Sequence, residues 1–161
     1  MQDIAGCRLL VSDAANQERV VEALSRLFDD VTIVDRRECP SYGYRAVHLI
    51  VTSHGKVIEI QVRTSLQHLW AELSEKFSDV VDPTIKYGGG GERIRELLAR
   101  ASDGVALEEL AEKQLADILA NSPPQDQLPE DLRQEITANR ERLSSCKQQL
   151  TDLLAELIAG I

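Results

Sequence analysis

The sequence predicts an α/β (α+β) fold, with a mixed β-sheet in the first half of the chain and a helical C-terminal extension. Over residues 1–80, apolar runs of strand length alternate with segments of helical periodicity, whereas residues 92–161 are helical in pattern almost throughout. We therefore expect three regions: a sheet domain at 1–80, a Gly-rich hinge with helices at 81–121, and a linker followed by a long amphipathic helix at 122–161.

The first strand and helix are predicted from two short patterns. Ile4 to Val11 is mostly apolar, which is typical of a buried strand, and Cys7 within it is expected to be a small core residue. Residues 16–28 carry apolar side chains at helical spacing, with Asn16 as the expected N-cap. Val31 to Val34 is a short strand candidate.

Two runs rich in β-branched residues, 45–52 and 56–63, are separated by Ser-His-Gly and predict a hairpin. In the second run polar and apolar residues alternate, so Glu59, Gln61 and Arg63 share one face of the strand. The sequence thus predicts a sheet face that is polar enough to line a site.

A helix over residues 66–81 is expected next, capped by Thr64 or Ser65, and Trp70 on its apolar stripe is expected to pack in the core. The four glycines at 88–91 predict either a flexible hinge or a place where the backbone comes close to another group.

The second half predicts helices at 92–101 and about 105–120, then a linker with three prolines, then a long helix from Leu128 to Ile158. The apolar stripe of the long helix consists of Leu132, Ile136, Asn139, Leu143, Cys146, Leu150, Leu153 and Leu157. The stripe fits a coiled-coil seam that makes the chain a homo-oligomer through its C-terminal helices, and it equally fits a helix packed on its own domain.

Composition narrows the class of protein. No apolar run approaches the roughly 20 residues of a membrane helix, and no basic region precedes the first apolar stretch, so we expect a cytoplasmic protein without a membrane partner. The net charge of −9 disfavours nonspecific binding to nucleic acid. Cys7, Cys39 and Cys146 are far apart and form no CxxC pair, which argues against disulfides or a zinc site.

Three motifs occur in a specific order: DIAGCR from Asp3 to Arg8, GYRAVH from Gly43 to His48, and EIQVRT from Glu59 to Thr64. A Trp-Ala pair follows at Trp70. Together, over residues 2–78, they resemble the alarmone synthetase domain of the RelA/SpoT family, whose pattern is DIAGxR, GYRSxH, EIQxRT and then a helix beginning near Trp-Ala.

The resemblance implies a nucleotidyltransferase-like mixed sheet and a GTP diphosphokinase reaction of the stringent response. In that reaction pyrophosphate passes from ATP to the 3′-hydroxyl of GDP or GTP with Mg²⁺. It also implies that Asp3 and Glu59 are the catalytic, metal-binding carboxylates, and Glu59 can accept the hydroxyl proton. From the residues alone, Asp3 also fits a strand-start or turn residue, and Glu59 fits a solvated strand face.

Substrate contacts are expected from the same motifs. The resemblance assigns Tyr44 to the guanine base, and a loop aromatic can stack on a purine or pack on the core. His48 can contact ribose or phosphate, or be an ordinary strand histidine. Gln61 and Arg63 share the polar strand face, and Arg8 can hold phosphate or pair with a carboxylate.

The sequence departs from the family pattern in two places. The family's domain normally begins well before DIAGxR with helices, an edge strand and basic residues that grip the ATP phosphates, so we expect an N-terminally truncated domain that lacks this part. Tyr42 stands where many members have Asn or Ser, and the loop has no Lys. The alternatives to an enzyme are a non-catalytic guanine-nucleotide-binding module and an oligomerisation module. Some relatives use the tRNA 3′ end as acceptor, for which the net charge gives no support.

Overall fold

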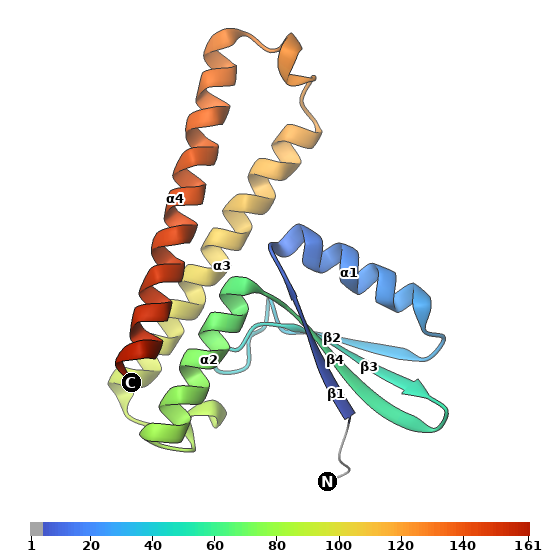
Figure 1. Ribbon diagram of the computed structural model, residues 1–161, viewed down its shortest axis with the longest axis vertical. Coiled ribbons are helices and arrows are strands. Elements are labelled where there is room, and N and C mark those ends of the chain that lie inside the picture. Colours follow the sequence, from blue (N-terminus) through green and yellow to red (C-terminus); the bar gives the residue numbers. More distant parts are fainter. Residues whose placement is uncertain (1–4) are drawn as a thin grey trace.

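The computed structural model describes residues 5–161 and confirms the mixed α+β class (Figure 1). A four-stranded sheet in the order β1-β4-β3-β2 carries α1 on one face, and the remaining helices gather at one end of the sheet. The elements are β1 (Ala5–Val11), α1 (Ala14–Leu27), β2 (Val31–Asp35), β3 (Val47–Ser53), β4 (Lys56–Thr64), α2 (Ser65–Val80), η1 (Ile85–Tyr87), α3 (Glu92–Ala120), η2 (Gln125–Gln127) and α4 (Glu130–Gly160).

The sheet is mixed because β1 runs parallel to β4, whereas β3 runs antiparallel to both β4 and β2. The predicted hairpin between β3 and β4 is confirmed. Its two turn residues, His54 and Gly55, have φ values of 51° and 71°, as a tight two-residue hairpin turn requires. The hairpin places the polar face of β4 in the middle of the sheet.

Two hydrophobic cores stabilise the molecule. The first lies between the sheet and α1, where buried residues of β3 and β4 such as Leu49 and Val62 meet Val20 and Leu24 of α1. The second core lies among α2, η1, α3 and α4 and contains the buried residues Leu73 and Trp70. The predicted core position of Trp70 is confirmed, since only 4% of the residue is exposed. The sheet face opposite α1 remains uncovered by this first core.

Two details of the N-terminal region correct the sequence prediction. The N-cap of α1 is Asp13, not Asn16, because the Asp13 carboxylate accepts a hydrogen bond of 2.7 Å from the Asn16 backbone N–H. Cys7 is exposed and is not a core residue, because β1 is an edge strand and the α1 layer reaches Val11 but leaves Cys7 uncovered.

The region after α2 also differs from prediction. Residues 92–120 form one helix, α3, and not two, because Gly104 continues the helix without a left-handed φ and lets α4 approach. The glycine run is a place of close approach: a Cβ added at Gly88 would lie 2.3 Å from the Tyr42 ring, and one at Gly90 would lie 2.5 Å from Ile85. These glycines are therefore required by packing.

The long helix α4 pairs with α3 in an antiparallel hairpin and also packs on α2 (Figure 1). Its predicted stripe separates into two rows. Ile136, Leu143, Leu150 and Leu157 form the inner row, which is buried or half-buried. In the outer row Leu132 is 41% and Leu153 is 52% exposed, and Cys146 is exposed. The inner row fits packing on the chain's own domain, and self-association through the C-terminal helices stays a prediction.

Two features bear on partners. Most of β1 is exposed at the edge of the sheet, including Leu9 and Leu10, so its unpaired side is open to another strand. Among the described helices, none is both long and apolar enough to cross a membrane.

Candidate functional site

The sheet face opposite α1, termed the open face, carries a row of polar side chains whose exposure falls from the half-buried Glu59 to the buried Arg63. Glu59, Gln61 and Arg63 alternate along β4 on this face, while Ile60 and Val62 point to the α1 core. His48 of β3 is paired in register with Gln61 and so lies on the same face. The predicted polar face is confirmed, and it lies on two central strands of the sheet.

A chain of hydrogen bonds joins these side chains to Tyr44. Arg63 Nη2 donates to the Tyr44 hydroxyl at 2.7 Å, and that hydroxyl lies 3.0 Å from His48 Nε2. His48 Nδ1 lies 2.6 Å from Glu59 Oε1, and Gln61 Nε2 donates to Glu59 Oε2 at 3.2 Å. Five of the sequence-predicted site residues, Tyr44 among them, therefore form one connected cluster.

With His48 in the tautomer that is protonated on Nδ1, the donors and acceptors of this chain run in one direction. The Tyr44 oxygen accepts from Arg63, so its proton is free to go to His48 Nε2. His48 then carries its own proton on Nδ1 and donates it to the Glu59 carboxylate. Each bond points from the cation Arg63 toward the anion Glu59, which is the electrostatically favourable order.

Tyr44 enters the cluster from a tight turn. Ser41 and Tyr44 exchange backbone hydrogen bonds of 3.0 and 3.3 Å, and the two residues between them, Tyr42 and Gly43, both have positive φ. Gly43 is packed so tightly that an added Cβ would lie 2.7 Å from the Trp70 indole, and its carbonyl accepts a 2.7 Å bond from Ser102 of α3. The turn is thus held by both α2 and α3.

The electrostatics of the cluster keep Glu59 ionised and Tyr44 neutral. Burial by itself raises the pKa of Glu59, but the hydrogen bonds from His48 and Gln61, with the charge of Arg63, outweigh it and hold the pKa below its ordinary value. Burial raises the pKa of the Tyr44 hydroxyl, and Arg63 only partly offsets it.

Arg63 is 3% exposed, and its Cζ lies 4.9 Å from the centre of the Tyr44 ring. Its Nε and Nη1 have no hydrogen-bond partner within residues 5–161. The buried guanidinium therefore fixes the orientation of Tyr44 through both its ring and its hydroxyl.

The other predicted site residues lie at the edge of this cluster or outside the described part. Arg8 of β1 is paired in register with Gln61, so it lies on the same face, and it is exposed. Its positive charge acts to lower the pKa of the Tyr44 hydroxyl. Asp3 belongs to residues 1–4 and lies outside the described residues, so its predicted role stays a prediction.

Among the described residues of the cluster, Glu59 is suited to supply one carboxylate ligand of a magnesium site. Glu59 is ionised at neutral pH, and each of its two oxygens accepts one side-chain hydrogen bond and keeps further lone-pair capacity. Over the described range, no cluster of three or more His, Cys, Asp and Glu is arranged to hold a metal ion. The predicted second carboxylate, Asp3, lies outside the described residues, so its part in a metal site stays a prediction.

The predicted cap of α2 at Thr64 is confirmed, whereas the sequence analysis missed Ser102 and Glu109, which help to hold the site in place. Ser102 accepts from Arg45 Nε at 2.9 Å while it donates to Gly43, so α3 is tied to the turn. Thr64 caps α2 in a capping box with Gln67, and Glu109 of α3 accepts from both. The Thr64-x-x-Gln67 spacing is a detectable signal of the cap, whereas no local pattern marks Ser102 or Glu109.

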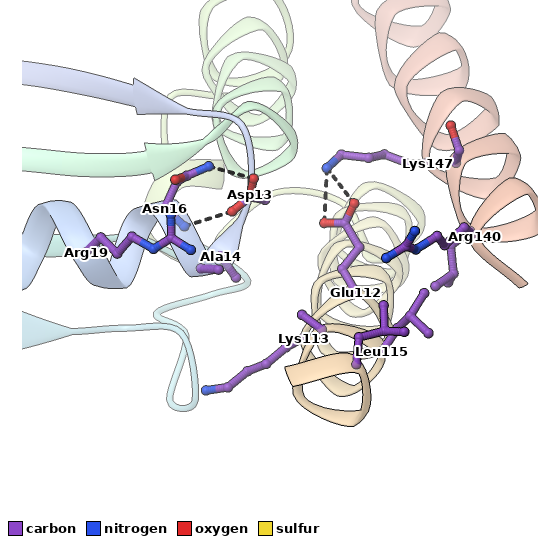
Figure 2. A pocket seen from close by; sticks show the side chains of 14 residues that line it. Asp13, Ala14, Asn16, Arg19, Glu112, Lys113, Leu115, Arg140 and Lys147 are labelled. Carbon is purple, nitrogen blue, oxygen red and sulfur yellow. Dashed lines mark hydrogen bonds and ion pairs between the residues drawn. The ribbon is translucent and has the colours of Figure 1, made fainter. Parts of the chain in front are cut away.

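A cavity of about 430 Å³ lies elsewhere, between α1, α3 and α4, and none of the predicted site residues lines it (Figure 2). Arg19 and Arg140 lie on opposite sides of the cavity. A third cation of the lining, Lys147, is already neutralised by an ion pair of 2.8 Å with Glu112. The Asp13 carboxylate occupies the N-terminal end of α1, where an anion would otherwise bind. We assign no ligand to this cavity.

Comparison with known proteins agrees with the motifs. Residues 1–78 match the model of one family, described as the region found in RelA and SpoT proteins. The uncharacterized proteins Rv1366 of Mycobacterium tuberculosis and Mb1401 of Mycobacterium bovis are each 37% identical to the chain over 100 residues, which is 58% of this chain and 36% of each relative. The chain thus spans little more than a third of these relatives.

Two solved structures are similar in fold. The small alarmone synthetase 2 from Bacillus subtilis superimposes with a TM-score of 0.53 and 26% identity, over 71% of this chain and 65% of that chain. The small alarmone synthetase 1 from Bacillus subtilis, solved with its product pppGpp, gives a TM-score of 0.55 and 22% identity, over 75% and 65%. The sheet and its helices therefore have the architecture of alarmone synthetases.

Proposed function

Because residues 1–78 match the region found in RelA and SpoT proteins and the fold is similar to that of a small alarmone synthetase, we propose that the open sheet face binds GDP or GTP and presents the 3′-hydroxyl for pyrophosphate transfer from ATP. The observation that carries the proposal is the directed hydrogen-bond chain from Arg63 through Tyr44 and His48 to Glu59. It places an aromatic ring and an ionised carboxylate on one uncovered surface.

The roles follow from the chemistry of each group. The Tyr44 ring stacks on the guanine, since its hydroxyl is already held by Arg63 and His48 and its plane is fixed. Glu59 accepts the proton of the 3′-hydroxyl as that oxygen forms a bond to the β-phosphorus of ATP, and the bond from this phosphorus to the α-phosphate oxygen breaks to release AMP. His48 donates to Glu59 and keeps its carboxylate oriented.

Magnesium, bound by Glu59 together with Asp3, would neutralise charge on the transferred phosphates. Arg8 is the exposed cation of the open face and is the proposed phosphate contact on β1. Gln61 accepts a hydrogen bond from Arg63 and donates one to Glu59, so it helps to keep these two side chains at a fixed separation.

The test is a transfer assay with ATP labelled on its γ-phosphate, with GDP or GTP and Mg²⁺, on the wild-type chain and on Glu59→Gln. We expect labelled guanosine tetra- or pentaphosphate from the wild type and a loss of at least about 100-fold in Glu59→Gln, because the amide can neither accept the proton nor bind the metal as an anion.

The matched control is Glu22→Gln, an exposed carboxylate on α1 on the opposite side of the sheet, which should retain the wild-type rate. Equal transfer by wild type and Glu59→Gln would remove Glu59 from the reaction and refute the proposed chemistry.

One observation favours a second function, binding of a guanine nucleotide without transfer. Among the described strand residues of the open face, the cations are Arg8 and the buried, already hydrogen-bonded Arg63. A triphosphate requires several positive groups for tight binding. Absence of product combined with GDP binding that is lost in Tyr44→Ala would identify this binding module.

A further inference from the structure

We infer that Tyr42 is a second aromatic contact for the purine base of the acceptor nucleotide, beside Tyr44. The inference rests on the proposed nucleotide site and extends it by a further base-binding residue. Tyr42 has a left-handed backbone conformation, and 65% of the residue is exposed. Neither feature stabilises the folded chain.

The backbone position is unsuited to tyrosine. Tyr42 and Gly43 are the central residues of the Ser41–Tyr44 turn, with φ of 55° and 89°. A turn with positive φ at both positions favours Asn-Gly or Asp-Gly, because a short polar side chain tolerates the left-handed region better than a bulky one. Strained residues of this kind persist where the surrounding structure holds them, and they concentrate at functional sites.

The surrounding structure seats the ring on one side only. Gly88, with φ of 84°, lies so close that an added Cβ would be 2.3 Å from Tyr42 Cε1 and 2.4 Å from Cδ1. Any residue other than glycine would displace the ring. A residue that served only to fasten the turn to the glycine run would be largely buried, whereas most of Tyr42 remains open to solvent.

Position and chemistry indicate a base as the occupant. Only Gly43 separates Tyr42 from Tyr44, and the turn that carries both is fixed by Trp70 and Ser102. A rigidly held, exposed aromatic ring offers a stacking surface at low cost in conformational entropy.

The test compares Tyr42→Asn with Tyr42→Phe in the full chain, by calorimetric titration with GDP and Mg²⁺ and by thermal unfolding. Asn suits the turn, so Tyr42→Asn should melt no lower than the wild type while binding GDP about 5- to 100-fold more weakly, the range expected for loss of one stacked base contact. Tyr42→Phe keeps the ring and should bind within about twofold of the wild type.

Three results would overturn the inference, and they are distinguishable. If the wild type binds GDP and Tyr42→Asn binds it equally well, Tyr42 has no contact with the base while the proposed nucleotide site stands. If Tyr42→Asn and Tyr42→Phe lose affinity and melting temperature together, Tyr42 has a structural role in the turn. If the wild type itself binds no GDP, the proposed function fails with the inference.

Discussion

At the scale of single residues, the cluster on the open face is ordered by charge. The buried Arg63 donates a hydrogen bond to Tyr44, and the ionised Glu59 accepts one from His48. Tyr44 and His48 are hydrogen-bonded to each other and so link the two charged groups. The alternation of β4 predicts which residues share the face, and this much could be read from the sequence. The hydrogen-bond order could not, because it depends on a turn that brings Tyr44 over β3.

A second residue-scale feature is a buried carboxylate without a partner. Glu108 on α3 is 8% exposed, and neither of its oxygens accepts a hydrogen bond from residues 5–161. Burial and the negative charges of Glu112 and Glu109, opposed by the charge of Lys147, together raise the pKa of Glu108 to about 7. The folded protein therefore binds this proton more tightly than the unfolded chain does.

This pKa predicts a dependence of stability on pH. As pH rises from the ordinary value of 4.5 through about 7, the folded state is progressively penalised by ionisation of Glu108. Glu108→Gln should therefore increase the free energy of unfolding at about pH 8 by roughly 1–3 kcal/mol, with a much smaller gain near pH 4. Urea unfolding at several pH values measures the difference.

The control for this prediction is Glu96→Gln, an exposed carboxylate on the same helix, which should show no comparable pH-dependent gain. A Glu108→Gln protein that is less stable than the wild type at about pH 8 would mean that the carboxylate has a favourable partner.

At the scale of elements, sequence periodicity located the strands and most helices, because burial on one face repeats at 2 or 3.6 residues. It failed where the outcome depends on tertiary packing. The sequence analysis ended one helix at residue 101 and began another at about 105, yet α3 continues through Gly104 because α4 packs alongside and the neighbouring Val105 is buried. The edge position of β1 likewise exposes Cys7, which an apolar run alone cannot reveal.

Gly104 provides the prediction at this scale. A Cβ at Gly104 would lie 3.8 Å from Leu150 Cδ1, an ordinary van der Waals distance, and the backbone there has no left-handed φ. Gly104→Ala should therefore increase the free energy of unfolding by about 0.5–1 kcal/mol, since alanine loses less conformational entropy in a helix. Denaturant unfolding measures this change.

The matched control is Gly43→Ala. Gly43 has φ of 89°, and its added Cβ would lie 2.7 Å from Trp70, so this variant should be destabilised. If Gly104→Ala is destabilised as well, α3 and α4 are closer together than the structure shows.

At the scale of the whole molecule, the site forms where the sheet meets the helices. The sheet supplies His48 and Glu59, while α2 and α3 hold the turn that supplies Tyr44. The motifs predicted the participating residues but not the anchor, because Ser102 is 59 residues from Gly43 in sequence and no local pattern joins them. The helices α2 and α3 thus contribute to the site by positioning the turn.

The most direct test of this account is to locate the GDP site by amide NMR on the full chain, with increasing GDP in the presence of Mg²⁺. We predict that the largest shift changes occur at Tyr44, His48 and Glu59, because these residues share the open face and one hydrogen-bond network. Shift changes confined to Arg19 and Arg140 would place the nucleotide in the cavity between α1, α3 and α4 and contradict the assignment of the open face.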